Sequence, residues 1–417
     1  MGNTISTLEH TATKPIKWIS LQPLLGGMSI GAEQAFGTPP TMILNYDGVA
    51  NTSAYVHYMN NVRKLNIPYY EFEGDIYSNS TTFKNNAHPD FSDVDVVSAV
   101  PICSGLSTAN AINDKSKETA RGANAKQNNN MLNCTEFTLG TIKPKCYIFE
   151  NAPALFTASG ADVLTKLDAI AQKYGYKSTF IKTNTMLHQN VQHRPRTFAI
   201  FTKGTNPVFH KVYEPFKGTI LDFLKDIPTS AKYQDVMMFK NMDKNDYIKY
   251  IKSKGADYRA EMEKINSPCV IDFILKTNDD ENACKIMSEK GAAFVRHARN
   301  KVNNNRNFFD NTPLWYGPNK VSVIFGRTFN RMIHPIREEG YNMREILTFM
   351  GMPYDFEWPD AEKKMNWIGQ NVPAHTAYDW HLQIREYLEG KLPTDNSPIK
   401  KLNNTEIEKA FKFGAVS

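Results

Sequence analysis

Short hydrophobic runs recur through the first 205 residues of the chain, separated by longer segments of mixed character. Runs of about four to eight apolar residues are typical of buried strands. The run at 93–100 is mostly apolar, as strands tend to be in a parallel sheet that is covered on both faces. We therefore predict strands at 18–21, 41–47, 69–76, 93–100, 146–151, 176–184 and 196–203.

Helical periodicity appears between and after these runs. Residues 51–65 carry a helical stripe of apolar side chains. In the segment after residue 151, Ser159 and Asp162 predict a capping box, and Gly175 predicts the end of the helix. Another helix is predicted between Pro373 and Gly390, and we expect it to pack on the first half of the chain. The two apolar faces are Val163, Leu164, Leu167, Ile170, Ala171 and Tyr174, and Ala377, Trp380, Ile384, Tyr387 and Leu388.

Alternation of strands and helices predicts an α/β fold, a Rossmann-like parallel sheet with helices on both faces. The periodicity is lost in residues 206–342, which predict a second, smaller and less regular domain. We therefore predict a first domain at 1–205, a second at 206–342, and a C-terminal segment, 343–417, that returns to the first. The length of 417 residues agrees with more than one core.

Composition narrows the class of protein only a little. Hydrophobic residues make up 41% of the chain and charged residues 22%, with no apolar run long enough for a membrane helix and no signal-peptide pattern. Five cysteines, none in a zinc-binding spacing, favour a reducing compartment and no metal. The net charge of +6 permits a polyanionic partner without requiring one.

Polar and reactive residues follow the predicted strands. In open parallel sheets, ligands bind at the carboxyl ends of the strands. Each residue has an ordinary alternative, since a glycine pair is usually a turn, Asp75 could cap a helix, and Cys103 could be a core thiol. Together they predict a nucleotide-like cofactor beside a nucleophile and a carboxylic acid. They are Gly26 and Gly27, then Asn45, Tyr46 and Asp47, then Asp75, then Pro101 and Cys103, then Glu150 and Asn151.

A further polar pattern precedes the last predicted strand. Gln192, Arg194 and Arg196 alternate at strand spacing, which would place all three on one face. Two arginines and a glutamine arranged in this way suit a polar substrate or phosphates. The alternative is an exposed edge strand.

The order of these motifs resembles the DNA (cytosine-5)-methyltransferase family, in its bacterial and viral single-chain form. The resemblance extends from about Trp18 to about Leu388. The matching segments are Pro101-Ile102-Cys103 with Ser107, Arg121–Gly122, the "FENAP" of 149–153, the Gln-x-Arg-x-Arg of 192–196, residues 332–356, and the "IGQNVP" of 368–373. The fold implied is a Rossmann-like S-adenosylmethionine-dependent methyltransferase sheet, with residues 206–342 as the target-recognition domain.

Several positions depart from the family pattern. Ser20 replaces an aspartate, Gln22 a phenylalanine that packs on adenine, and Leu24 a glycine. Asn45 stands where an acid usually holds the ribose, and Gln370 where asparagine is usual. All of these lie on the cofactor side, whereas the cytosine-side motifs are retained.

The resemblance implies a reaction in which a cysteine thiolate adds to C6 of a flipped-out cytosine and C5 takes a methyl group from S-adenosylmethionine. Cys103 would be the nucleophile, Glu150 would hold or protonate N3, Arg196 would contact O2, and Arg194 would support Arg196 or Glu150. No metal is required. The residues expected to bind the cofactor are Leu25, Gly26, Gly27, Asn45, Tyr46, Asp75, Ile76, Pro101, Asn371 and Val372.

Double-stranded DNA is the partner that the resemblance implies, with a monomer acting in the cytoplasm of a bacterium or virus-infected cell, associated with the nucleoid. Residues 104–130 are polar and rich in small residues, which suits a mobile lid, although an insertion without a role would look the same. Cations mixed with asparagines at 296–307 suit phosphates and base edges, or a solvated surface. The residues expected to contact DNA are Ser107, Arg121, Gln192, Arg296, Arg299 and Arg331.

Two alternatives remain open at the level of sequence. One is an RNA cytosine-5 methyltransferase of the same fold. The other is a catalytically weakened nucleic-acid-binding relative, which the altered first motif would favour. A metabolic dehydrogenase is disfavoured, because its Gly-x-Gly-x-x-Gly spacing is missing and the Gln-x-Arg-x-Arg segment would be unexplained.

Overall fold

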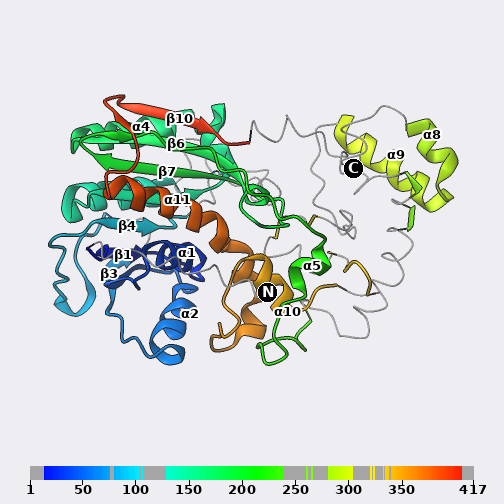
Figure 1. Ribbon diagram of the computed structural model, residues 1–417, viewed down its shortest axis with the longest axis horizontal. Helices are drawn as coiled ribbons and strands as arrows, with labels where there is room; N and C mark the ends of the chain where they lie inside the picture. The colour runs from blue at the N-terminus through cyan, green and yellow to red at the C-terminus, as the bar shows by residue number, and fades with distance from the viewer. Residues whose placement is uncertain are drawn as a thin grey trace.

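A computed structural model describes residues 14–75, 79–102, 106, 128–237, 260–261, 264–265, 280–303, 320–321, 323–324, 332, 334–337 and 340–405. Its centre is an eight-stranded sheet with the strand order β10-β6-β7-β5-β4-β1-β2-β3 (Figure 1). The strands are β1 (Trp18–Leu21), β2 (Met42–Asp47), β3 (Tyr69–Asp75), β4 (Val96–Ala99), β5 (Cys146–Asn151), β6 (Tyr176–Asn184), β7 (Pro195–Lys203) and β10 (Ile399–Asn403). Each predicted strand is present; β10 was not predicted.

One strand departs from the predicted parallel sheet. β7 runs antiparallel to both β5 and β6, while the other neighbouring strands are parallel. Residues 185–194 join β6 to β7 and contain only the single turn η7 (Thr185–Leu187). A parallel connection needs a crossover of about a dozen residues or more, usually a helix, so this short link returns the chain in the opposite direction.

Helices cover both faces of the sheet. α1 (Gly27–Phe36) and α11 (Ala374–Leu388) lie on one face, in a core built around Trp18, Phe36 and Trp380. α3 (Asn128–Phe137) and α4 (Ala161–Lys173) lie on the other (Figure 1). The strands supply alternate residues to the two cores, as their period of two requires. In β5, Cys146 and Ile148 face α1 and α11, whereas Tyr147 and Phe149 face α3 and α4.

The start of α4 differs from the prediction. The helix begins at Ala161 with Gly160 as its N-cap and no side-chain capping bond, so the predicted capping box of Ser159 and Asp162 is wrong. A 3₁₀ turn, η6 (Ala158–Gly160), leads directly into the helix. A Cβ on Gly160 would lie 2.5 Å from the carbonyl oxygen of Ala154, so close approach of the preceding backbone selects glycine here.

A third core joins the predicted domains. α5 (Ile220–Leu224), α10 (Met343–Phe349), Val321 and Ile324 pack with Tyr55 of α2 (Thr52–His57) and with Leu25. α8 (Asp280–Ile286) and α9 (Glu289–Asn303) lie at the far end of the molecule from the sheet (Figure 1). The remaining elements include η1 (Tyr58–Val62), η2 (Lys84–Asn86), η4 (Thr138–Ile142), η5 (Pro153–Phe156), β8 (Asn206–Pro207), η9 (Ala361–Gln370) and β9 (Thr394–Asp395).

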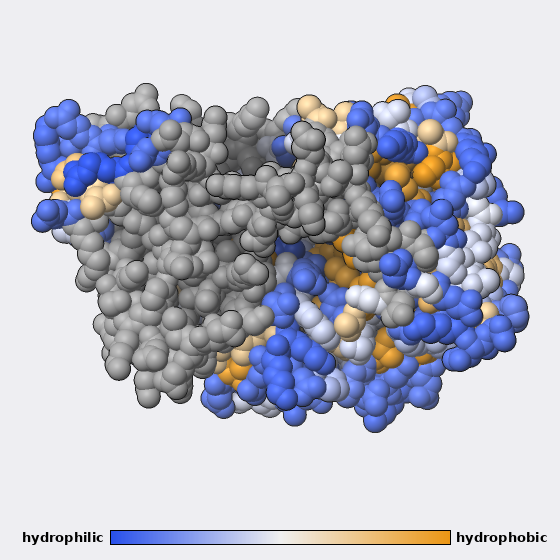
Figure 2. All heavy atoms as spheres, turned by 180° about the vertical axis from the view of Figure 1, so that it is seen from behind, coloured by the Kyte–Doolittle hydropathy of each residue, from blue (hydrophilic) through white to orange (hydrophobic). Residues whose placement is uncertain are grey.

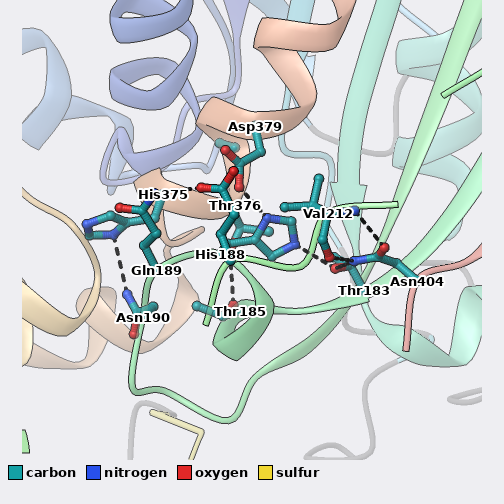
Figure 3. Close-up of polar contacts among 12 residues, drawn as sticks. Thr183, Thr185, His188, Gln189, Asn190, Val212, His375, Thr376, Asp379 and Asn404 are labelled. Atoms are coloured by element: carbon teal, nitrogen blue, oxygen red, sulfur yellow. Dashed lines mark hydrogen bonds and ion pairs between the residues drawn. The ribbon is translucent and has the colours of Figure 1, made fainter. Parts of the chain in front are cut away.

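A buried polar network attaches the C-terminal strand to the sheet (Figure 3). Asn404 Nδ2 donates to Thr183 Oγ1 at 3.0 Å, and that hydroxyl lies 2.6 Å from His188 Nε2. His188 Nδ1 lies 2.6 Å from Asp379 Oδ2 of α11. Because Thr183 accepts from Asn404, its own proton can go to His188 Nε2, and the Nδ1–H then donates to Asp379. The network thus joins β6, α11 and the residue after β10.

The described surface is mostly hydrophilic when seen from behind, with small hydrophobic areas between the polar ones (Figure 2). None of the helices in the described ranges combines the length and apolar character that a membrane span needs.

Candidate active site

The carboxyl ends of β4, β1, β2 and β3 lie side by side, with β5 next to β4. The chain leaves β1 toward β2 on one side and reaches β4 on the other, which is the topological switch point of such a sheet. Glu150 is the last residue but one of β5, Pro101 follows β4, and Leu25 and Gly26 follow β1. The strands therefore place the predicted base-handling and cofactor-handling residues at one edge.

Glu150 is buried, with 4% of its surface exposed, and is paired with Arg196 of β7. Arg196 Nε lies 2.6 Å from Glu150 Oε1. Burial raises the pKa of Glu150, and the opposing charges of Arg196 and Arg194 do not cancel that effect. Oε1 has no hydrogen bond of ordinary geometry to a described residue. Glu150 is therefore easier to protonate than an exposed glutamate.

Arg194 does not share this position. Its guanidinium donates from Nη1 to the carbonyl of Ile324 at 2.7 Å, and from Nη2 to those of Gly369 at 3.1 Å and Asn371 at 2.7 Å. The side chain is 1% exposed. Arg194 thus binds backbone from distant segments of the chain, and its charge reaches Glu150 only through space.

Gln192 and Arg194 precede β7, which begins at Pro195. Both are buried, and β7 lies between β5 and β6, so the alternative of an exposed edge strand is wrong. Gln192 Nε2 contacts the carbonyl of Phe349 and Sδ of Met350. A direct DNA contact by Gln192 stays a prediction.

Other residues of the chain pack directly against the two glycines after β1. Gly26 is the N-cap of α1 with φ of 105°, and a Cβ there would lie 2.2 Å from the ring of Tyr55. A Cβ on Gly27 would lie 1.9 Å from the carbonyl oxygen of Val372. Gly27 N–H donates to Asn371 Oδ1 at 2.8 Å. The contact of Tyr55 with Gly26 was not predicted from the sequence. A glycine pair before a helix was the available signal that another residue packs closely there.

Asn45 and Tyr46 are buried at the end of β2. The amide of Asn45 is engaged on both sides, since Nδ2 donates to the carbonyl of Val49 at 3.2 Å and Oδ1 accepts from Thr52 Oγ1 at 3.1 Å. The Tyr46 ring stacks on Phe72 with 4.1 Å between the centroids. Asn45 therefore organises the loop after β2.

Other atoms at this edge have the character of a ligand site. Gln22 is fully buried in a left-handed conformation, with φ of 48°. Its Oε1 accepts from Cys134 Sγ at 3.1 Å, and its Nε2 has no hydrogen-bond partner among the described residues. Asp75 is exposed at the end of β3. These residues fit a methyl donor with a nucleoside and an amino-acid part at the ends of β1 and β3, and do not fit it at Asn45.

The two arginines of α9 that were expected to contact DNA differ from each other. Arg296 is exposed. Arg299 forms a bidentate pair with Asp280 of α8, from Nε to Oδ2 at 2.6 Å and from Nη2 to Oδ1 at 2.7 Å. Arg299 therefore joins the two helices.

Several predicted site residues lie outside the described residues, so the structure says nothing of them. Within the described ranges, no three His, Cys, Asp or Glu side chains are arranged to hold a metal ion. The predicted residues outside those ranges are Ile76, Cys103, Ser107, Arg121 and Arg331, with most of the expected lid at 104–130.

Solved structures share this fold. A putative DNA modification methyltransferase encoded within a prophage of E. coli is 16% identical, with a TM-score of 0.52 and coverage of 90% of this chain and 99% of that chain. An Entamoeba histolytica methyltransferase, EhMeth, is 12% identical with a TM-score of 0.51 and the same coverage. S. pombe Dnmt2 methyltransferase is 11% identical with a TM-score of 0.50, covering 89% of this chain and 99% of that one. At these identities they confirm the methyltransferase fold alone.

The sequence itself carries the family assignment. A search of curated proteins found no match. The family model described as C-5 cytosine-specific DNA methylase matches residues 16–385, which is most of the chain and includes Glu150, Arg194 and Arg196. This match confirms the resemblance drawn from the motifs, and the chain belongs to the C-5 cytosine-specific DNA methylase family.

Proposed function

We propose that this protein transfers a methyl group to C5 of a flipped-out cytosine in double-stranded DNA, through a covalent adduct with Cys103. The observation that carries the proposal is the buried pair of Glu150 and Arg196 at the carboxyl edge of the sheet. A carboxyl group with a raised pKa beside a fixed cation suits a cytosine ring, which gains a proton at N3 while its O2 accepts hydrogen bonds.

The register of the sheet supports a place for Cys103 near this pair. β4 and β5 are parallel neighbours, with Ala99 opposite Phe149. The segment after β4 therefore leaves the sheet beside Glu150, and Cys103 follows four residues after Ala99. We propose that the Cys103 thiolate forms the bond to C6 while Glu150 delivers a proton to N3, so that C5 gains electron density.

The remaining steps restore the aromatic ring. C5 would take the methyl group as the bond from sulfonium sulfur to methyl breaks, which leaves S-adenosylhomocysteine. The C5 proton would then leave to a base, Glu150 would take back the N3 proton, and the C6–S bond would break to release Cys103. Arg196 would hold O2 in the ring plane throughout. Arg194 would hold the segment that carries Arg196.

S-adenosylmethionine would supply the methyl group as an electrophile. We propose that Gln22 Nε2, the α1 turn at Leu25 and Gly26, Asp75 and Pro101 hold it, since they lie at the ends of neighbouring strands. Gly27, Tyr46, Asn371 and Val372 would shape the same region from behind. Asn45 would act through the loop after β2, because its amide is already engaged.

DNA containing 5-fluorocytosine tests the proposal. Fluorine cannot leave as a proton, so a working enzyme incubated with S-adenosylmethionine and a mixed-sequence duplex should form a stable adduct. Cys103→Ala should abolish the adduct, and the matched control Cys284→Ala, in α8, should retain it.

The same experiment distinguishes the alternatives. An adduct on folded RNA but not on duplex DNA would replace the DNA proposal by an RNA cytosine-5 methyltransferase. If neither nucleic acid gave an adduct, and calorimetry with S-adenosylmethionine showed no heat, the chain would be a nucleic-acid-binding relative without methyl transfer.

A further inference from the structure

Arg194 brings together three segments that are far apart in the sequence. Its own segment leads into β7, Ile324 belongs to the predicted target-recognition domain, and Gly369 and Asn371 lie just before α11. The segment of Ile324 runs beside that of Arg194, because Val321 N donates to the carbonyl of Val191 at 2.9 Å and His193 N donates to that of Val321 at 2.8 Å. One guanidinium therefore fixes all three.

A second contact continues this connection to the cofactor side. Asn371 gives its carbonyl to Arg194, and its side-chain Oδ1 accepts from Gly27 N at 2.8 Å. Gly27 opens α1, at the turn proposed to hold the methyl donor. Arg194 is thus joined to that turn through a single residue.

A further set of contacts relates Arg194 to the pair of Glu150 and Arg196. Arg194 N donates to Asn184 Oδ1 at 3.0 Å, and the Arg194 carbonyl accepts from Thr185 N at 3.1 Å. Two residues on, Arg196 reaches Glu150. The backbone of Arg194 is held at both its N–H and its C=O, so the Arg194 guanidinium and Arg196 keep one relative position.

We propose that Arg194 is a positioning residue that couples occupancy of the cytosine site and the target-recognition segment to the cofactor turn. This inference rests on the proposed function. Binding at one site would fix the segments of Ile324 and Asn371 around Arg194, and the second ligand would then find its own site already ordered. The coupling is reciprocal, so either ligand should tighten the binding of the other.

Substitution of Arg194 by lysine tests whether the planar guanidinium group is required. A planar guanidinium can serve carbonyls from separate segments, whereas an ammonium on a flexible stem cannot hold the same set in fixed directions. Arg194→Lys keeps the positive charge near Glu150 and removes the hydrogen bonds that hold the three segments together.

Arg344 provides a matched control within the chain. It is also fully buried and also donates to several carbonyls, those of Met352, Pro353 and Tyr354. All of these belong to one short segment after α10, so Arg344→Lys should cost comparable stability without uncoupling distant parts.

The experiment is calorimetry of S-adenosylhomocysteine binding to the full chain, alone and with the duplex that forms the adduct described above. Wild-type protein and Arg344→Lys should bind it about tenfold more tightly with DNA than without. Arg194→Lys should keep the affinity measured without DNA and lose most of the tightening. Asn371→Ala removes the contact to Gly27 and should also lose most of the tightening by DNA, whatever its affinity without DNA. The double variant should lose no more of the tightening than either single variant, because the two contacts act in series.

Four results would overturn the inference. Wild-type protein could bind both ligands without mutual tightening. Arg194→Lys could keep the tightening, or Arg344→Lys could lose it to the same extent. Loss of S-adenosylhomocysteine binding by Arg194→Lys without DNA would make Arg194 a support of the α1 turn alone. If wild-type protein bound no S-adenosylmethionine and formed no adduct, the proposed function itself would fail, which the trapping experiment reveals separately.

Discussion

The surroundings of Glu150 shift its pKa in opposite directions. Burial raises its pKa, while the charges of Arg196 and Arg194 lower it, and burial has the larger effect. A carboxyl group whose pKa is higher in the folded state favours folding when protonated. That contribution is complete below the unfolded pKa and is lost as the pH rises through the folded pKa. At a pH above the folded pKa, burial of the charged Glu150 therefore lowers the stability of the fold.

Glu150→Gln copies the protonated form at every pH but cannot give its proton away. We expect kcat to fall by about 10²- to 10⁴-fold, as for loss of a general acid, and the melting temperature at pH 8 to rise. Steady-state kinetics and thermal unfolding measure the two effects.

Glu136 provides a control of opposite sign. Burial alone would raise its pKa, but hydrogen bonds from Lys173 and Tyr174 lower it. Glu136→Gln should therefore lower the melting temperature at pH 8 and leave kcat unchanged. A lower melting temperature for Glu150→Gln at pH 8 would show that its ion pair outweighs burial.

The arginines of α9 lead to a second prediction at this scale. Arg296 is exposed, whereas Arg299 is bound to Asp280. If α9 faces DNA, Arg296→Ala should weaken binding at all sequences and reduce the salt dependence by about one unit of slope. Arg299→Ala should instead lower stability by about 0.2–1 kcal/mol, as expected for a partly exposed pair. DNA affinity at several salt concentrations, together with urea unfolding, separates the two, and equal salt slopes for both variants would contradict the assignment.

At the scale of elements, α1 and α11 approach each other closely at Gly31. A Cβ on Gly31 would lie 2.5 Å from the carbonyl oxygen of Ala374 and 2.7 Å from Cβ of Ala377. These helices carry the cofactor turn at one end and bury Trp380 against the sheet. Their spacing therefore depends on the absence of one side chain.

Gly31→Val should force the two helices apart. We expect the free energy of unfolding to fall by about 1–3 kcal/mol, the usual cost of overpacking. Gly37→Asn is the matched control, because Gly37 has φ of 74° with no atom within 4 Å of a Cβ, and asparagine tolerates that conformation. Urea unfolding measures the free energy of unfolding of both variants. Equal decreases would mean that the loss of stability comes from replacing glycine in the backbone and not from the spacing of the two helices.

The sequence predicts these elements where local signals suffice. Short runs rich in apolar and aromatic residues locate β1 to β7, and Pro373 and Gly390 bound α11 closely. The direction of β7 depends on the length of a connection, and β10 is half-exposed with lysines in its middle, so neither has a clear local signal. In the candidate site, the motifs identify Glu150 and Arg196. The carbonyls held by Arg194 cannot be predicted, because they depend on how distant segments pack.

At the scale of the whole molecule, α11 connects the sheet, the third core and the C-terminal strand. It carries His381, which is fully buried, and His375, which is partly buried, and burial lowers the pKa of each to about 4. His381 Nδ1 lies 2.7 Å from the carbonyl of Ala377 and Nε2 lies 3.0 Å from Ser98 Oγ, which satisfies a neutral ring. His375 Nδ1 accepts from Asn190 at 3.3 Å (Figure 3). Among the described residues, Asp379 has the one charge that favours a proton on His375, and it only partly offsets burial there. No described charge favours a proton on His381.

Acid should therefore destabilise the whole fold through α11. Below the ordinary histidine pKa of about 6.5 the unfolded chain gains protons that the folded chain cannot bind until about pH 4, so stability falls as the pH falls through this window. His381→Gln keeps one donor and one acceptor and removes the titration. Between pH 6.5 and 4.5, wild-type protein should lose about 2 kcal/mol more than this variant in urea unfolding. Above pH 7 the two curves should be parallel, and parallel curves down to pH 4.5 would mean that His381 gains its proton without unfolding α11.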